Sequence, residues 1–167
     1  MYRIIPAIIV VLIDQFSKYL VKTKFILFES QSIIEPFLRF TYIENSGLAF
    51  GLPVGGFAWL LFLITLIISL YISYYIISYN NIIKYEALSL SLILGGAIGN
   101  LIDRGLTLLN LFNYKGVIDF IDIGIGDFYR WPYIFNIADL NVSLGIIIFI
   151  LCSYFNSNQN DLEDEVA

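Results

Sequence analysis

Residues 57–77 read FAWLLFLITLIISLYISYYII, an apolar stretch without one charged side chain. A helix needs roughly 20 mainly apolar residues to cross the hydrocarbon core of a bilayer, so this stretch predicts a transmembrane helix. The rest of the chain has the same character: 59% of its 167 residues are hydrophobic and 14% are charged, whereas a soluble domain has about 25% charged residues. The sequence therefore indicates a membrane protein of one domain. It excludes a disordered chain, a collagen-like repeat and a nucleic-acid-binding protein.

Three more apolar stretches complete the pattern. They are residues 4–21, 87–102 and 134–155, so the sequence predicts four spans in all. The first stretch follows Arg3 as the apolar core of a signal peptide would. No small-residue cleavage site follows Ile13, however, and we interpret the stretch as a retained helix.

Four spans put both termini on one side of the membrane and gather residues 22–56 and 105–133 on the other. Within the first of these segments, Phe37–Ile43 alternates in a way that is typical of a strand or hairpin. We therefore expect an all-α membrane protein, four transmembrane helices with a small β-rich surface element. One domain would cover residues 1–155, and the polar, acidic tail 156–167 is expected to be disordered.

The residue types that are missing restrict the possible chemistry. The chain has no histidine, and Cys152 is its single cysteine. Histidine-based metal sites, Ser-His and Cys-His nucleophile pairs, intrachain disulfides and CxxC sites are thereby excluded. Hydrolytic chemistry would have to use Asp, Glu, Lys, Ser, Thr or Tyr side chains.

Charged side chains inside or beside the expected spans are the main sign of a functional site. An ionisable group within a bilayer costs about 2.5–3.5 kcal/mol, and it marks a site by default. Asp14 and Lys18 stand four residues apart on one helix face, and Asn100 and Arg104 repeat that spacing. In a four-span arrangement these side chains converge at one membrane face with four others: Asn45, Asp119, Asn136 and Asp139.

A pair of carboxylates is the simplest hydrolytic machinery that remains. Two close carboxylates do not both ionise, so one keeps a proton while the other acts as a base toward water. Asp119 and Asp139 are the candidates. Each alone also fits an ordinary role, Asp139 as a charge at a helix N-terminus and Asp119 as a loop acid.

Two other classes of function stay open from the residues alone. A small transporter or proton-relay protein would use Asp14, Lys18, Arg104 and Asp139 as a charge pathway, and it predicts polar residues spread through the membrane depth. A structural scaffold would explain the glycine-rich stretch Gly95–Gly99, which lets another helix approach closely, but it leaves the paired acids without a purpose.

Five short motifs, taken together, resemble those of a known family. They are Asp14-Gln-Phe-Ser-Lys18, Asn45-Ser-Gly-Leu-Ala-Phe50, Gly95-Gly-Ala-Ile-Gly-Asn-Leu-Ile-Asp-Arg104, Val117-Ile-Asp-Phe120 and Phe135-Asn-Ile-Ala-Asp139. In this order, in a four-span chain of this length, they resemble the motifs of the bacterial lipoprotein signal peptidase, or signal peptidase II, family.

The resemblance implies an intramembrane aspartyl endopeptidase that removes signal peptides from diacylglyceryl-modified prolipoproteins, just before the lipidated cysteine. By motif match, Asp119 and Asp139 would be the catalytic pair, and Asp103, Asp122 and Asp127 would be bystanders in the chemical step. Eight residues would line or support the pocket: Asp14, Lys18, Asn45, Gly47, Asn100, Arg104, Asn136 and Ala138. The family needs no metal or organic cofactor, and globomycin inhibits it. The expected partners are prolipoprotein substrates and membrane lipid, with the chain as a monomer and no nucleic acid.

The resemblance and the charge distribution disagree about orientation. Most Lys and Arg residues, seven of the nine in the chain, lie on or near the side of the two long loops, which by charge counting alone belongs in the cytoplasm. The resemblance instead places both termini in the cytoplasm and the active site on the extracytoplasmic side of the inner membrane. We adopt the second orientation because the motifs are the more specific signal.

Overall fold

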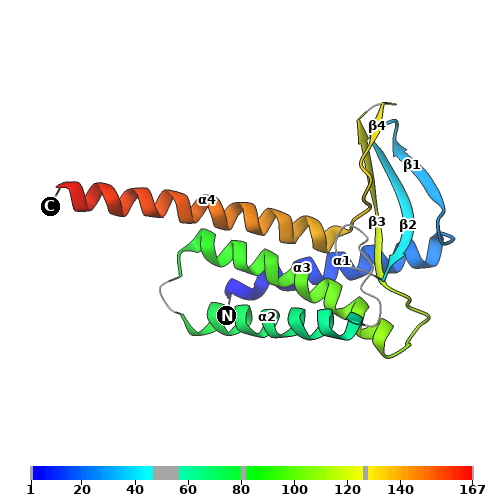
Figure 1. The fold of residues 1–167 in the computed structure, drawn as a ribbon, viewed down its shortest axis with the longest axis horizontal. Coiled ribbons are helices and arrows are strands. Elements are labelled where there is room, and N and C mark those ends of the chain that lie inside the picture. The colour runs from blue at the N-terminus through cyan, green and yellow to red at the C-terminus, as the bar shows by residue number, and fades with distance from the viewer. Residues whose placement is uncertain (1, 47–56, 80–81, 126–127, 167) are drawn as a thin grey trace.

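The computed structural model describes residues 2–46, 57–79, 82–125 and 128–166, the last ten by their backbone alone. Four long helices run alongside one another, and a sheet stands across the end of the bundle that is opposite to both termini (Figure 1). The elements are η1 (Tyr2–Ile4), α1 (Ile5–Lys24), β1 (Ser30–Ile34), β2 (Leu38–Asn45), α2 (Ala58–Ser78), α3 (Lys84–Leu108), β3 (Val117–Ile125), β4 (Tyr129–Arg130) and α4 (Ile137–Val166). The expected fold class is confirmed.

All four long helices have the length and composition that crossing a membrane requires. α3 extends beyond the expected 87–102 at both ends. α4 begins at Ile137 rather than at residue 134, because Phe135 is tied to Ile121 of β3 by a backbone bridge. Its backbone then stays helical through Val166, beyond residue 155, where the span was expected to end. An established helix lengthens at little cost, and residues 156–166 contain neither Gly nor Pro to stop it.

The expected β-rich element is an antiparallel sheet with strand order β1-β2-β3-β4. β2 and β3 form its centre, and at the end nearest the helices Asn45 pairs with Val117. A Cβ on Gly116 would lie 2.7 Å from the backbone nitrogen of Ser46. The segment before β3 and the end of β2 therefore approach each other closely enough to require glycine at this position. The sheet therefore brings the end of β2 and the start of β3 together at the mouth of the bundle.

α3 is the central helix, and its glycines let two neighbours approach it. A Cβ on Gly95 would lie 2.7 Å from Cβ of Val10 in α1. A Cβ on Gly96 would clash with the carbonyl oxygen of Ala138 in α4 and lie 2.6 Å from Cγ2 of Val142. The outward faces of α1, α2 and α4 carry exposed Ile, Leu, Phe and Tyr side chains, as lipid-facing surfaces do.

Gly96→Ala should destabilise the protein, because its new methyl group meets the backbone of α4 and the helices have to move apart. Overpacking of this kind costs about 1–3 kcal/mol, and we expect a lower midpoint of thermal unfolding in detergent micelles. Gly105→Ala is the matched control: its Cβ would meet only the Phe62 ring, at 3.3 Å, and the helix gains about 1 kcal/mol from alanine. Equal midpoints for the two variants would contradict the close packing of α3 against α4.

Candidate functional site

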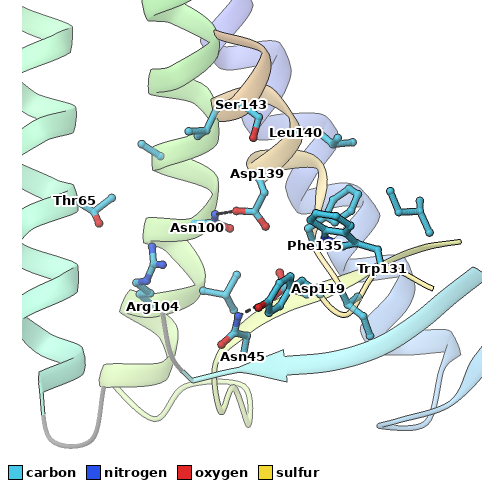
Figure 2. Close-up of a pocket in the computed structure, with 16 residues that line it drawn as sticks. Asn45, Thr65, Asn100, Arg104, Asp119, Trp131, Phe135, Asp139, Leu140 and Ser143 are labelled. Atoms are coloured by element: carbon cyan, nitrogen blue, oxygen red, sulfur yellow. Dashed lines mark hydrogen bonds between the residues drawn. The ribbon is translucent and has the colours of Figure 1, made fainter. Parts of the chain in front are cut away.

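A cavity of about 680 Å³ lies between α2, α3, α4 and the inner end of the sheet. Asp119 of β3 and Asp139 of α4 both line it, together with Asn45, Asn100 and Arg104 (Figure 2). Five of the ten residues expected at the site therefore border one space. Among the described residues, none forms a hydrogen bond or an ion pair with the Arg104 guanidinium, and the Arg104 side chain borders the cavity.

Asp139 is fixed by the way α4 begins. Asn136 precedes the first helical residue, and its Oδ1 accepts a hydrogen bond of 2.9 Å from the backbone N–H of Asp139. In return, Asp139 Oδ2 accepts one of 3.2 Å from the backbone N–H of Asn136. This reciprocal arrangement is a capping box. It holds the Asp139 carboxyl beside a helix N-terminus, where negative charge is favoured.

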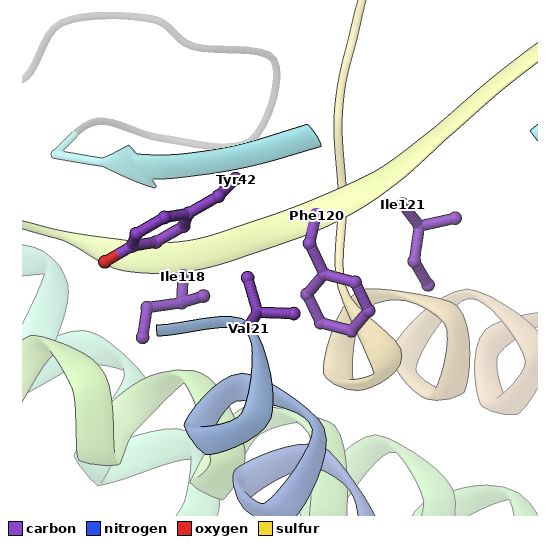
Figure 3. Close-up of a cluster of buried hydrophobic side chains, with 5 residues drawn as sticks. All are labelled: Val21, Tyr42, Ile118, Phe120 and Ile121. Atoms are coloured by element: carbon purple, nitrogen blue, oxygen red, sulfur yellow. The ribbon is translucent and has the colours of Figure 1, made fainter. Parts of the chain in front are cut away.

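Asp119 is fixed by strand alternation. Its neighbours Ile118 and Phe120 pack against Val21 of α1 (Figure 3), and Asp119 faces the cavity although it is only 2% exposed. Burial and repulsion from Asp139 raise the pKa of Asp119 to about 7, against the hydrogen bonds and the positive charge that favour its ionised form. This carboxyl therefore changes its protonation state close to neutral pH.

Asparagine side chains connect the two carboxyls. Asn136 Nδ2 lies 2.7 Å from Asp119 Oδ1 and 3.0 Å from Asn100 Oδ1. Asn100 Nδ2 donates to Asp139 Oδ1 at 2.7 Å, and Asn45 Nδ2 donates to Asp119 Oδ2 at 3.1 Å. Both oxygens of each carboxyl therefore accept a hydrogen bond. One hydrogen-bond network spans β2, β3, α3 and α4.

A buried ion cluster lies directly behind this network. The Lys18 ammonium lies 2.8 Å from Asp14 Oδ2 and 3.0 Å from Asp103 Oδ2, and it donates to Asn100 Oδ1 at 3.0 Å. Lys18, Asp14 and Asp103 have no exposed surface. The second oxygen of Asp14 accepts from the backbone N–H of Ala138 at 2.9 Å. Asp103 accepts from the backbone N–H of Ile118 at 3.0 Å.

Sequence reasoning missed two members of this cluster. The prediction for Asp103 concerns only the chemical step, where its bystander role stays a prediction, and it did not extend to this cluster. Gln15 lies outside the predicted site, although its Nε2 lies within 3.2 Å of both Asp14 and Asp103. The signal was present in the spacing, because Asp103 stands three residues after Asn100 and so shares its helix face. Gly99 belongs to the same contact, since a Cβ there would lie 2.6 Å from Asp14 Oδ2.

The remaining expected residues fall into three groups. Asp14, Lys18, Asn136 and Ala138 are buried behind the cavity rather than on its wall. Asp122 lies outside it and forms an ion pair of 2.9 Å with Arg130. Gly47 and Asp127 lie outside the described residues. Within the part of the chain that the structure describes, no group of three His, Cys, Asp or Glu side chains is arranged to hold a metal ion.

The family model described as "Signal peptidase (SPase) II" matches residues 6–155. A lipoprotein signal peptidase of Syntrophus aciditrophicus is 40% identical over 152 residues, 89% of each chain. One of Staphylococcus aureus is 36% identical over 98% of this chain and 93% of its own. Two solved structures described as bacterial membrane enzymes superpose with TM-scores of 0.78 and 0.75, at 34% and 36% identity. They cover 95% and 90% of this chain, and 90% and 91% of their own.

Lys18→Met should destabilise the protein strongly, because it leaves Asp14 and Asp103 buried without their shared cation. Removing one partner of a buried ion pair costs about 3–5 kcal/mol. We expect a large fall in the midpoint of thermal unfolding in micelles, or no folded protein. Lys24→Met, an equal change at an exposed position of the same helix, is the control. If Lys18→Met and Lys24→Met unfold at the same temperature midpoint, Lys18 does not hold the cluster together.

Proposed function

The chain belongs to the signal peptidase II family, and from this premise we propose that it is an aspartic endopeptidase of lipoprotein processing. Its substrates are diacylglyceryl-modified prolipoproteins, and it cuts their signal peptides off just before the lipidated cysteine. Membership makes the chain a membrane-embedded peptidase; the aspartic mechanism and the position of the cut are our proposal.

One observation carries the aspartic mechanism: Asp119 and Asp139 line the same cavity and share a hydrogen-bond network through Asn136. Since the sequence has no histidine, and its single cysteine lies on α4 beside another pocket at the far end of the bundle, a carboxyl pair is the simplest route to an activated water. The transporter alternative predicts polar groups along the whole membrane depth. The ion cluster and both carboxyls instead gather at the sheet end of the bundle, which favours an enzyme.

In the proposed reaction, Asp139 is the base and Asp119 is the acid. Asp139 lies at a helix N-terminus with donors on both oxygens, which favours its ionised form. It takes a proton from a water molecule whose oxygen attacks the scissile carbonyl carbon. Asp119 donates its proton to the carbonyl oxygen. The carbon–nitrogen bond then breaks as the leaving nitrogen takes a proton from the pair, which releases a carboxyl and an amine. The two groups titrate jointly.

The other cavity residues bind and orient. The planar fork of Arg104 suits the carbonyl oxygens of an extended peptide, and its permanent charge rules it out as a base. Asn45 and Asn100 orient the two carboxyls. Asp14, Lys18, Asn136 and Ala138 support them from behind. The glycine expected at position 47 keeps its proposed role in the pocket by motif match alone.

We propose that residues 1–155 are the catalytic domain, that both termini and the extension 156–167 are cytoplasmic, and that the cavity faces the extracytoplasmic side. The helix arrangement supports this, because both termini lie at the end opposite to the sheet (Figure 1). Counting Lys and Arg residues favours the opposite orientation. Three of those residues, Lys18, Lys22 and Arg130, form ion pairs within the protein, so they are weaker evidence for a cytoplasmic side. Since one chain supplies both carboxyls and the cavity wall, a monomer suffices.

Asp119→Asn and Asp139→Asn should each abolish cleavage of a diacylated precursor while the protein still inserts and folds. An amide neither activates water nor carries the proton. Asp122→Asn, outside the cavity, is the control and should keep substantial activity. Globomycin-sensitive cleavage by the parent chain identifies the reaction. Near-normal turnover by either active-site variant would remove that residue from the pair.

Asn45→Ala should move the alkaline limb of the pH profile of kcat/KM to higher pH. The active form needs one proton on the pair, so activity is lost as pH rises through the upper pKa. The pKa of Asp119 is raised to about 7 by burial and by Asp139, and the hydrogen bond from Asn45 holds it down. Without that bond the pKa rises, and a shift of about one pH unit is expected. A shift to lower pH would contradict the assignment of the proton to Asp119.

A further inference from the structure

Glu44 stands one residue before Asn45, at the end of β2, and its carboxylate is 5% exposed. Three donors converge on it. Lys22 of α1 lies 2.6 Å from Oε1, the backbone N–H of Lys115 donates to Oε2 at 2.6 Å, and the Tyr42 hydroxyl donates to Oε1. One side chain thus ties α1, β2 and the segment before β3 to each other.

Lys22 strengthens this tie from its own side. Its ammonium lies 3.3 Å from the carbonyl oxygen of Asn113 and 4.4 Å from the centre of the Tyr114 ring. The Tyr42 ring packs in the cluster that seats β3 on α1 (Figure 3). Burial alone would raise the pKa of Glu44, but hydrogen bonds from Lys22, Tyr42 and Lys115 outweigh burial and keep that pKa below its usual value. The group is therefore a carboxylate at neutral pH.

Successive strand residues point to opposite faces. Glu44 points toward Lys22, Tyr42 and the backbone of Lys115. Asn45 points to the other face of the strand, where it lines the cavity and donates to Asp119. We propose that Glu44 is a positioning residue, whose carboxylate fixes the end of β2 so that Asn45 donates to Asp119. The inference rests on the proposed function, since it concerns the same carboxyl.

The direction in which the alkaline limb of the pH profile moves distinguishes this positioning role from a direct effect of the Glu44 charge on Asp119. Asp119 faces Asp139 from α4, Arg104 from α3 and Lys18 from α1, while Glu44 faces Lys22, Tyr42 and Tyr114. Removing the charge of Glu44 by itself would lower the pKa of Asp119. Displacing Asn45 would raise that pKa, because a donor to the ionised form is lost.

The test compares Glu44→Gln with Asn45→Ala and with the double variant, in full-length protein in micelles and with a diacylated precursor. Glu44→Gln should lower kcat about tenfold through one misplaced hydrogen bond. KM should stay within about twofold, and the alkaline limb should move up by about half a pH unit. In the Asn45→Ala background it should change neither kcat nor the limb any further, because the residue acts through Asn45. Glu35→Gln, the same change at an exposed position in the turn between β1 and β2, should match the parent chain.

Three results would overturn the proposal. The kinetics of Glu44→Gln could be unchanged, its alkaline limb could move to lower pH, or its effects on kcat and on the limb could add to those of Asn45→Ala in the double variant. If Glu44→Gln does not fold, Tyr42→Phe decides by the same criteria. It removes one donor to Glu44 and keeps the ring. Activity in Asp119→Asn would overturn the proposed function itself. An inactive Asp119→Asn beside an unaffected Glu44→Gln would overturn only the role of Glu44.

Discussion

The structure around the cavity depends on one buried cation. An ammonium in an apolar surrounding is costly unless opposite charge and hydrogen-bond acceptors surround it, and Lys18 has Asp14, Asp103 and Asn100 within 3.0 Å. Each of the two carboxylates also accepts from a backbone N–H of another element. Asp14 accepts from Ala138, immediately before Asp139, and Asp103 accepts from Ile118, immediately before Asp119. The cluster therefore locates both carboxyls of the proposed pair through the residues that precede them.

The same cation orients the amide that contacts the pair. Because the Asn100 oxygen faces the Lys18 ammonium, its nitrogen has to face away from it, toward Asp139. Asn136 is constrained in a similar way, with its oxygen on the helix cap and its nitrogen toward Asp119. Amides do not titrate in the working range, so they hold the two carboxyls in place without exchanging protons with them. Their hydrogen bonds to Asp119 oppose the rise in its pKa that burial and Asp139 cause.

Sequence reasoning reached the features that repeat along one element. The spacing of Asp14 and Lys18 and the uncharged stretch 57–77 each needed only helix periodicity, and the gathering of polar residues at one end followed from the number of spans. It missed features that depend on how elements meet. Asp103 matters because β3 passes over it, Glu44 because α1 and the 113–115 segment close on it, and α4 begins late because Phe135 pairs with β3. These contacts form between elements that are distant in the sequence, and the spacing of Asp103 from Asn100 is the single local sign of any of them. The glycines were interpreted as packing, and their contacts with α1 and α4 agree.

The position of the site at the end of the bundle resolves a conflict between its two requirements. The pKa of Asp119 rises to about 7 because the carboxyl is buried and lies near the negative charge of Asp139. At a water-covered surface, solvent would hydrate the carboxylate and screen that charge. Peptide hydrolysis needs water, which the middle of a bilayer excludes. At the junction of four helices and a sheet, Asp119 is 2% exposed and yet borders a cavity of about 680 Å³. The strand supplies what a fifth helix would not: side chains alternate, so Ile118 and Phe120 are packed against α1 while Asp119 between them faces the cavity. The sheet is thus what allows a membrane bundle to keep an acid both desolvated and within reach of water.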